Sequence, residues 1–161
     1  KMITTKPKVL IAEPYEVLRK LYHLVLEKDA DVICVPNINK AWDIFQKDPD
    51  YHLIVLPVRL EDNNPGFTAL ADITLSYITP QNEFTFPQPV RIGIIPSSSS
   101  EYEQILSTVK EFGGHGILVK DKYPFDQWPT IATLAVDPEK HERLERLLES
   151  YKPVLLQRKS K

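Results

Sequence analysis

Five short and almost continuously apolar segments recur along this chain of 161 residues. They occupy residues 8–13, 32–35, 52–56, 90–95 and 116–119. Each has the length of a buried strand and is too short for a buried helix. Segments with helical spacing of apolar residues separate them, and parallel strands joined by such crossovers are buried on both faces. The alternation therefore predicts a three-layer α/β/α domain around a five-stranded parallel sheet.

The segments between the strands carry the apolar stripes of helices that cover a sheet. After Asn37 or Asn39, either of which can cap a helix, residues 41–45 contain an inward-facing group. Ser97–Ser100 are expected to cap a further helix, which ends at Gly113. Residues 16–28 contain six aliphatic residues in a helix-spaced stripe, the pattern of a face packed on a core. The six are Val17, Leu18, Leu21, Leu24, Val25 and Leu26.

The chain continues beyond the fifth strand with two more helical segments. Residues 125–136 predict a short helix, and Asp137 with Pro138 starts an extra C-terminal helix over 138–152. Its stripe covers its own domain or binds a partner helix, and the first interpretation is favoured. The stripe consists of Leu144, Leu147, Leu148 and Tyr151. We assign residues 1–136 to one domain and residues 137–161 to a C-terminal helix and tail, either an extension of that domain or a linker.

Composition excludes several classes of function. The formal net charge of −2 provides no basic surplus for nucleic acid. No apolar run approaches the roughly 20 residues that span a bilayer, so no membrane association is expected. The lone Cys34 has no partner for a disulfide within the chain, which favours the reducing cytoplasm. The four histidines lack metal-ligand spacing and no catalytic triad is visible, so neither a metal site nor an enzyme is predicted.

Residues 52–67 resemble the acceptor segment of response-regulator receiver domains. In the receiver pattern, an apolar strand leads to a phosphoryl-accepting aspartate, then to a leucine and to Pro-Asp-x-x-Gly-Phe. Here the strand leads to Pro57, followed by Leu60, Asp62, Gly66 and Phe67. Further landmarks in register extend the resemblance over residues 8–125, among them Glu13 after the first strand and Lys120 after the fifth. The resemblance implies a flavodoxin-like (CheY-like) fold with strand order 2-1-3-4-5.

The same resemblance gives roles to five positions of the receiver phosphorylation pocket. Glu13 keeps the first of two magnesium-binding acids, and Pro14 stands where the second is found. Pro57 stands in place of the acceptor aspartate. Ser97 is the candidate for the hydroxyl residue that contacts the phosphoryl group, and Lys120 keeps the lysine that does so. The pocket is therefore interpreted as degenerate.

These replacements remove the chemistry of a receiver. Proline has no carboxylate and no backbone donor, whereas an acyl phosphate needs a carboxylate nucleophile. Glu13 alone is a poor magnesium site, so no cofactor is expected, and Lys120 is predicted to form an ion pair with Glu13. Prolines stand at the ends of four predicted strands: Pro14, Pro36, Pro57 and Pro96. They remove backbone donors from the edge where open α/β sheets bind ligands, but they can also simply end their strands. Strand termination is favoured for Pro36 and Pro96 and loss of function for Pro57, and the edge is predicted to be closed to phosphate.

The favoured function is a non-phosphorylatable pseudo-receiver that acts in two-component-like signal transduction through protein–protein contacts. The resemblance implies an output face on the fourth helix, fifth strand and fifth helix, which the last helix can extend. The candidate contact residues are Tyr102, Ile105, Ile117, Trp128, Leu144 and Leu148. Two alternatives stay open. One is a small-molecule sensor or enzyme that uses the rim at Glu13, Asp62, Ser97 and Lys120. The other is a structural dimerisation module, in which the C-terminal helix contacts a second copy of the chain.

Overall fold

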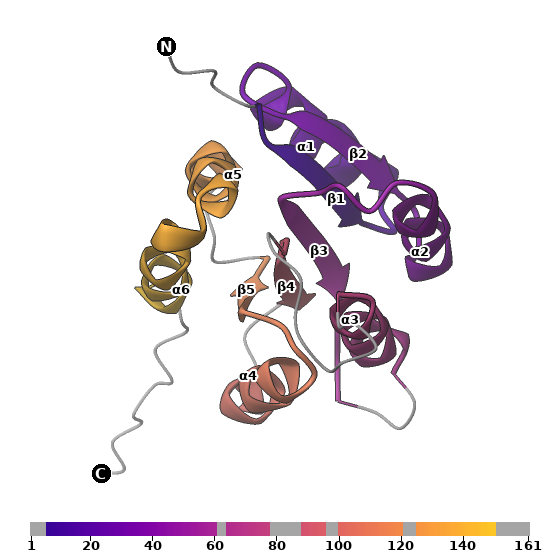
Figure 1. Ribbon diagram of the computed structural model, residues 1–161, viewed down its shortest axis with the longest axis vertical. Helices are drawn as coiled ribbons and strands as arrows, with labels where there is room; N and C mark the ends of the chain where they lie inside the picture. The colour runs from indigo at the N-terminus through magenta and orange to yellow at the C-terminus, as the bar shows by residue number, and fades with distance from the viewer. Residues whose placement is uncertain (1–5, 61–63, 78–87, 96–99, 121–124, 151–161) are drawn as a thin grey trace, which may run out of the picture.

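A computed structural model describes residues 6–60, 64–77, 88–95, 100–120 and 125–150 (Figure 1). The strands are β1 (Lys8–Ala12), β2 (Asp31–Val35), β3 (Leu53–Pro57), β4 (Val90–Ile95) and β5 (Gly116–Val119). The helices are α1 (Glu16–Leu26), α2 (Ile38–Lys47), α3 (Pro65–Leu75), α4 (Tyr102–Glu111), α5 (Trp128–Val136) and α6 (His141–Ser150). Single 3₁₀ turns, Phe125–Gln127 and Pro138–Lys140, precede α5 and α6.

The strands form one parallel sheet in the order β2-β1-β3-β4-β5. β1 pairs with β2 and with β3, which places Ile11 opposite both Cys34 and Val55. Two apolar clusters flank the sheet. One contains side chains of α1, α5 and α6, and the other contains side chains of α2, α3 and α4. The two groups of helices lie on opposite sides of the sheet (Figure 1). The predicted three-layer fold and strand order are confirmed.

Local signals define several of the helix ends. The Asn37 side chain accepts the Lys40 N–H at 2.9 Å, so Asn37 is the cap of α2. Gly113 follows α4 with a φ of 97°, a left-handed conformation that favours glycine. The start of α4 differs from the expectation. α4 begins at Tyr102 with Glu101 at its N-cap, rather than a serine, and residues 97–99 lie outside the described ranges.

Two histidines extend the ladder at the amino end of the sheet. The Nδ1 of His52 accepts the Lys8 N–H at 3.0 Å, and the Nδ1 of His115 accepts the Arg91 N–H at 3.1 Å. In each case the ring nitrogen accepts a backbone N–H near the start of a strand, where a neighbouring strand would otherwise supply a carbonyl. Burial lowers the pKa of His52, and burial together with the nearby Arg91 charge lowers the pKa of His115 to about 3. Both rings are therefore neutral at neutral pH.

Helix α1 corrects the expectation drawn from its sequence. Val17 and Leu24 are 70% and 66% exposed, whereas Tyr22 and Leu26 are fully buried. At 3.6 residues per turn, positions 17, 21 and 24 lie on the opposite side of the helix from position 26. The six-residue stripe is therefore two stripes, and only one faces the sheet. Tyr22, which the aliphatic pattern left out, supplies the core contact: its ring lies 5.2 Å from that of Trp128 on α5.

The residues expected to form an output face are buried, which is a second correction to the sequence prediction. Each of the six is at most 3% exposed, because each belongs to one of the two clusters that cover the sheet: Tyr102, Ile105, Ile117, Trp128, Leu144 and Leu148. A desolvated core side chain has no surface left for a partner. These side chains hold α4, β5, α5 and α6 together instead.

Helix α6 packs beside β5 and α5. Leu148 lies against Gly116 on β5, where an added Cβ would come within 2.8 Å of the leucine Cδ1. The ion pair between Lys110 on α4 and Glu145 on α6, at 3.7 Å, links the helix to the other layer. The favoured interpretation of its stripe is confirmed for Leu144 and Leu148, and Tyr151 lies outside the described residues.

Candidate functional site

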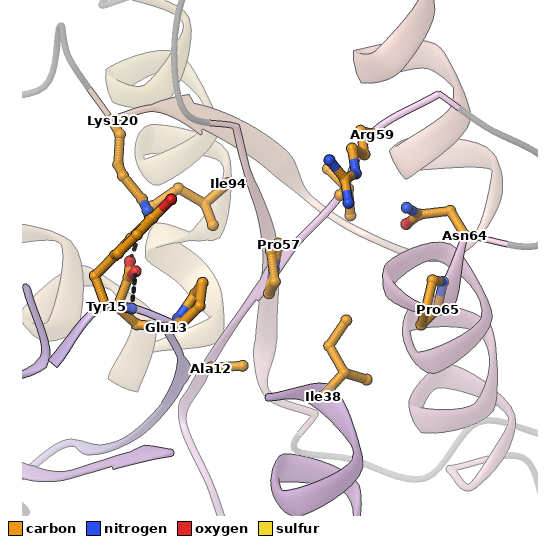
Figure 2. Close-up of a pocket in the computed structure, with 12 residues that line it drawn as sticks. Ala12, Glu13, Tyr15, Ile38, Pro57, Arg59, Asn64, Pro65, Ile94 and Lys120 are labelled. Atoms are coloured by element: carbon orange, nitrogen blue, oxygen red, sulfur yellow. Dashed lines mark hydrogen bonds and ion pairs between the residues drawn. The ribbon is translucent and has the colours of Figure 1, made fainter. Parts of the chain in front are cut away.

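The carboxyl end of the sheet contains a cavity of about 440 Å³ (Figure 2). Glu13 and Lys120 directly follow β1 and β5, and Pro57 ends β3. These residues lie at one edge because parallel strands all end on the same side of a sheet. Its apolar lining comprises Ala12, Pro14, Ile38, Pro57, Val58, Pro65 and Ile94. Its polar lining comprises Glu13, Tyr15, Arg59, Asn64 and Lys120. In Figure 2, Glu13, Tyr15 and Lys120 lie on one side of Pro57, and Arg59 and Asn64 lie on the other.

The predicted ion pair between Glu13 and Lys120 is confirmed. The Lys120 Nζ lies 2.8 Å from Oε1 of Glu13, and the Glu13 side chain is only 1% exposed. Its other oxygen, Oε2, accepts the Tyr15 N–H at 3.0 Å. The Lys120 ammonium also lies 5.4 Å from the centroid of the Tyr15 ring, within reach of a cation–π interaction. A buried carboxylate needs such partners, and here both oxygens have one.

Pro57 ends β3 without disturbing the ladder. It lies opposite Ile94 of β4, and the next residue, Val58, donates its N–H to the Ile94 carbonyl at 3.1 Å. The start of α3 approaches the Pro57 carbonyl closely. A Cβ at Gly66 would lie 2.0 Å from that oxygen, so only glycine fits. The Asn64 side chain accepts the Gly66 N–H at 3.0 Å and completes this turn.

A magnesium ion does not fit this arrangement. Magnesium requires near-octahedral oxygen ligation. Pro14 and Pro57 offer no side-chain oxygen, and both oxygens of Glu13 are engaged within the protein. Across the described residues, no group of three or more His, Cys, Asp or Glu side chains is placed to hold a metal. Burial raises the pKa of the Cys34 thiol to about 12, so it is not a ready nucleophile.

The structure brings together four of the five predicted pocket positions: Glu13, Pro14, Pro57 and Lys120. Ser97 lies outside the described residues, as does Asp62 of the alternative rim. Four further residues that line the cavity were not predicted as site residues: Ile38, Arg59, Asn64 and Pro65. One signal for the last two was available: Asn-Pro-Gly before an apolar run is an N-cap followed by proline at the first position of a helix.

No protein-family profile matches the chain, and no curated protein matches it. Solved structures do. An orphan response regulator of H. pylori gives a TM-score of 0.62 at 13% identity, covering 81% of this chain and 97% of that one. A signal receiver domain of an HD domain-containing protein from Pseudomonas fluorescens gives 0.60 at 16% identity, covering 86% and 99%. A receiver domain from Saccharomyces cerevisiae, in complex with a histidine phosphotransfer signalling protein, gives 0.56 at 18% identity, covering 74% and 81%. The chain therefore has the fold of receiver domains.

None of the helices in the described ranges is long and apolar enough to cross a membrane.

Proposed function

We propose that this chain is a pseudo-receiver, a signalling module of the two-component type that acts through protein contacts in the cytoplasm and accepts no phosphoryl group. The observation that carries the proposal is Pro57 at the end of β3, beside the assembled cavity. The resemblance places the acceptor aspartate of receivers at this position. Glu13 and Lys120 remain, but they neutralise each other at 2.8 Å. The chain keeps the fold of a receiver, but at the acceptor position it has a proline in place of the nucleophilic aspartate.

Chemical inertness tests the proposal directly. Incubation with acetyl phosphate and magnesium should leave the intact mass unchanged, because proline has no acceptor oxygen. A receiver domain that carries the aspartate, treated in parallel, shows that the phosphodonor is active. A gain of about 80 Da, the mass of one phosphoryl group, mapped to residues 52–67 would contradict the proposal.

Restoring the aspartate alone should not restore the chemistry. Pro57→Asp is expected to remain unmodified in the same assay, because Pro14 supplies no second carboxylate and Glu13 is held by Lys120 and the Tyr15 amide. Without these acids, magnesium does not bind beside the new carboxylate. A phosphorylated single variant would mean that the cavity is an intact acceptor pocket lacking one residue.

The surface that supports a protein contact lies on α1. Val17, Leu21 and Leu24 recur at helical spacing on its outer side, and all three are at least 36% exposed. Tyr15, next to the helix start, is 65% exposed. Single exposed apolar residues are ordinary on a protein surface, whereas a stripe of three along one helix indicates an interaction site. We name these three residues the α1 stripe and propose it as the contact surface.

An amphipathic helix of another protein fits the α1 stripe, since apolar side chains at helical spacing pack against a facing helix. The similar receiver domain in complex with a phosphotransfer protein supports a protein partner in general terms. A second copy of the chain is the alternative occupant, and the mass in solution distinguishes the two. Without a phosphoryl group, any switch between states must come from different affinities of a partner or ligand for those states.

A further inference from the structure

The two edges of the sheet differ in how well they are covered. The strand order makes β2 and β5 the outer strands. All four residues of β5 are buried, and α4 and α6 pack beside it. On β2, Asp31 and Ile33 are exposed, and Val32 and Cys34 are half-buried. Among the described residues no strand pairs with the outer side of β2, so this edge of the sheet is open.

The open edge presents backbone groups that can form hydrogen bonds. Asp31 donates its N–H to the carbonyl just before β1, and Val35 accepts the N–H just after β1, both at 2.8 Å. Successive residues of a strand direct their backbone groups to opposite sides. The N–H and C=O groups of Val32 and Cys34 therefore point away from β1, and an exposed row of such groups is a template for another strand.

The middle of β2 lacks the features that protect an edge strand. Proteins block edge pairing with charged side chains, prolines or bulges. Residues 32–35 contain neither a charge nor a proline, since Asp31 and Pro36 lie just outside them. Ile33 is 37% exposed within this apolar segment. An apolar side chain at that place favours contact with a further strand over contact with solvent.

We propose that β2 pairs antiparallel with β2 of a second copy of this chain, so that the two sheets join into one. In the two-fold register centred on Ile33, Val32 lies opposite Cys34 of the second copy, and Cys34 lies opposite Val32. These are hydrogen-bonded pairs, so all four outward groups of each copy are used. Ile33 faces its own counterpart at the two-fold axis, in the non-hydrogen-bonded position where side chains are closest. The same patch serves both copies, so the assembly closes as a dimer.

Charge favours this arrangement over a parallel one. Parallel pairing in register would place Asp31 beside Asp31 of the second copy, and like charges directly opposite each other destabilise a sheet. The antiparallel register places each Asp31 beside Val35 of the second copy instead. Val35 lies two residues before Asn37, the cap of α2, and the amino end of a helix attracts negative charge. A second copy therefore satisfies the backbone groups, the apolar side chain and the charge of this edge together.

The dimer goes beyond the contact proposed at the α1 stripe and does not depend on it, so matched variants of the two surfaces test it. The wild type should have twice its chain mass of 18.5 kDa by light scattering. Ile33→Lys and Ile33→Glu should each weaken dimerisation at least about tenfold, because like charges then meet at the axis. An equimolar mixture of the two should restore the dimer, since lysine then faces glutamate. Leu24→Lys and Leu24→Glu, on the α1 stripe, should leave the mass unchanged.

A second copy bound at the α1 stripe would give the reverse result, with the dimer lost in the Leu24 variants and kept in the Ile33 variants. That result overturns the proposal. A wild type that is monomeric at its highest soluble concentration also overturns it, as does a mixture that associates no better than either Ile33 variant alone.

Cysteine cross-linking tests the register without added charge. In a Cys34→Ala background, Ile33→Cys should form a disulfide-linked dimer on mild oxidation, because the Cα atoms of a non-hydrogen-bonded pair lie about 4.5 Å apart. Asp31→Cys in the same background is the control, since its two copies would lie roughly 14 Å apart along the strands and should stay unlinked. A melting curve shows that each variant is folded, and if the Ile33 charge variants do not fold, cross-linking alone decides. No link at position 33, or equal linking at position 31, overturns the proposal.

Discussion

The first and last helices in the described part of the chain both carry apolar stripes, and they use them in opposite ways. On α6, Leu144 and Leu148 are buried against the rest of the domain. On α1, one apolar face is buried through Tyr22 and Leu26, while Val17 and Leu24 on the opposite face are exposed. An apolar stripe on a helix therefore identifies a surface that needs covering, but it does not say whether the same chain covers it.

Truncating a leucine in each helix is expected to give the largest difference. Leu148→Ala should lower the free energy of unfolding by about 2–5 kcal/mol, because it removes a buried side chain that is packed on Gly116. The matched change Leu24→Ala should cost less than about 0.5 kcal/mol, since that side chain is mostly exposed. Urea denaturation followed by circular dichroism measures both. Equal losses would show that the two helices do not differ in this way.

The second largest effect is expected from low pH, which should lower the free energy of unfolding through His115, close to the start of α6. The His115 ring lies 5.7 Å from the ring of His141 at the start of α6, and its folded-state pKa of about 3 lies below the ordinary value of 6.5. Between these two values the unfolded chain binds more protons, so stability is complete above about pH 6.5 and falls as the pH is lowered.

At pH 5 the loss through this histidine reaches up to about 2 kcal/mol. His115→Asn, whose side-chain oxygen can still accept the Arg91 N–H, should flatten that part of the pH profile. His52 also has a lowered pKa and contributes in the same direction, so its slope should remain in the variant. An unchanged pH profile in His115→Asn would mean that the pKa of this ring is not lowered in the folded protein.

The smallest effect on stability should accompany the largest effect on association. Leu21→Glu combined with Leu24→Glu places charge on the α1 stripe, where both side chains already meet solvent. The melting temperature should change little, whereas a partner or second copy bound there should be lost, because a desolvated interface does not tolerate an unpaired charge. Light scattering and capture of the partner measure this. A partner that the double variant still captures excludes the α1 stripe.

The sequence predicted the fold because its signals are local and repeated. Five buried strands alternating with helices leave few arrangements of the chain, and the receiver resemblance selected one strand order. Part of the site followed as well. Glu13 and Lys120 end strands that point to the same edge of the sheet, so their ion pair could be expected from topology and charge alone. Arg59 and Ile38 could not be expected at the cavity, because they come from a loop and from the start of α2.

Apolar spacing determined which helices this protein forms, but tertiary packing decided which faces of them are buried. Spacing in α1 is satisfied equally by Leu26 and by Leu24, on opposite sides of one helix. The choice was made by contacts far along the chain, where Tyr22 meets Phe125 and Trp128. In the same way, the sequence places Pro57 at the end of a strand, and only the packing around it left a cavity of about 440 Å³ at that point. Local chemistry is carried by each residue, whereas burial and empty space depend on neighbours that the chain brings together by folding.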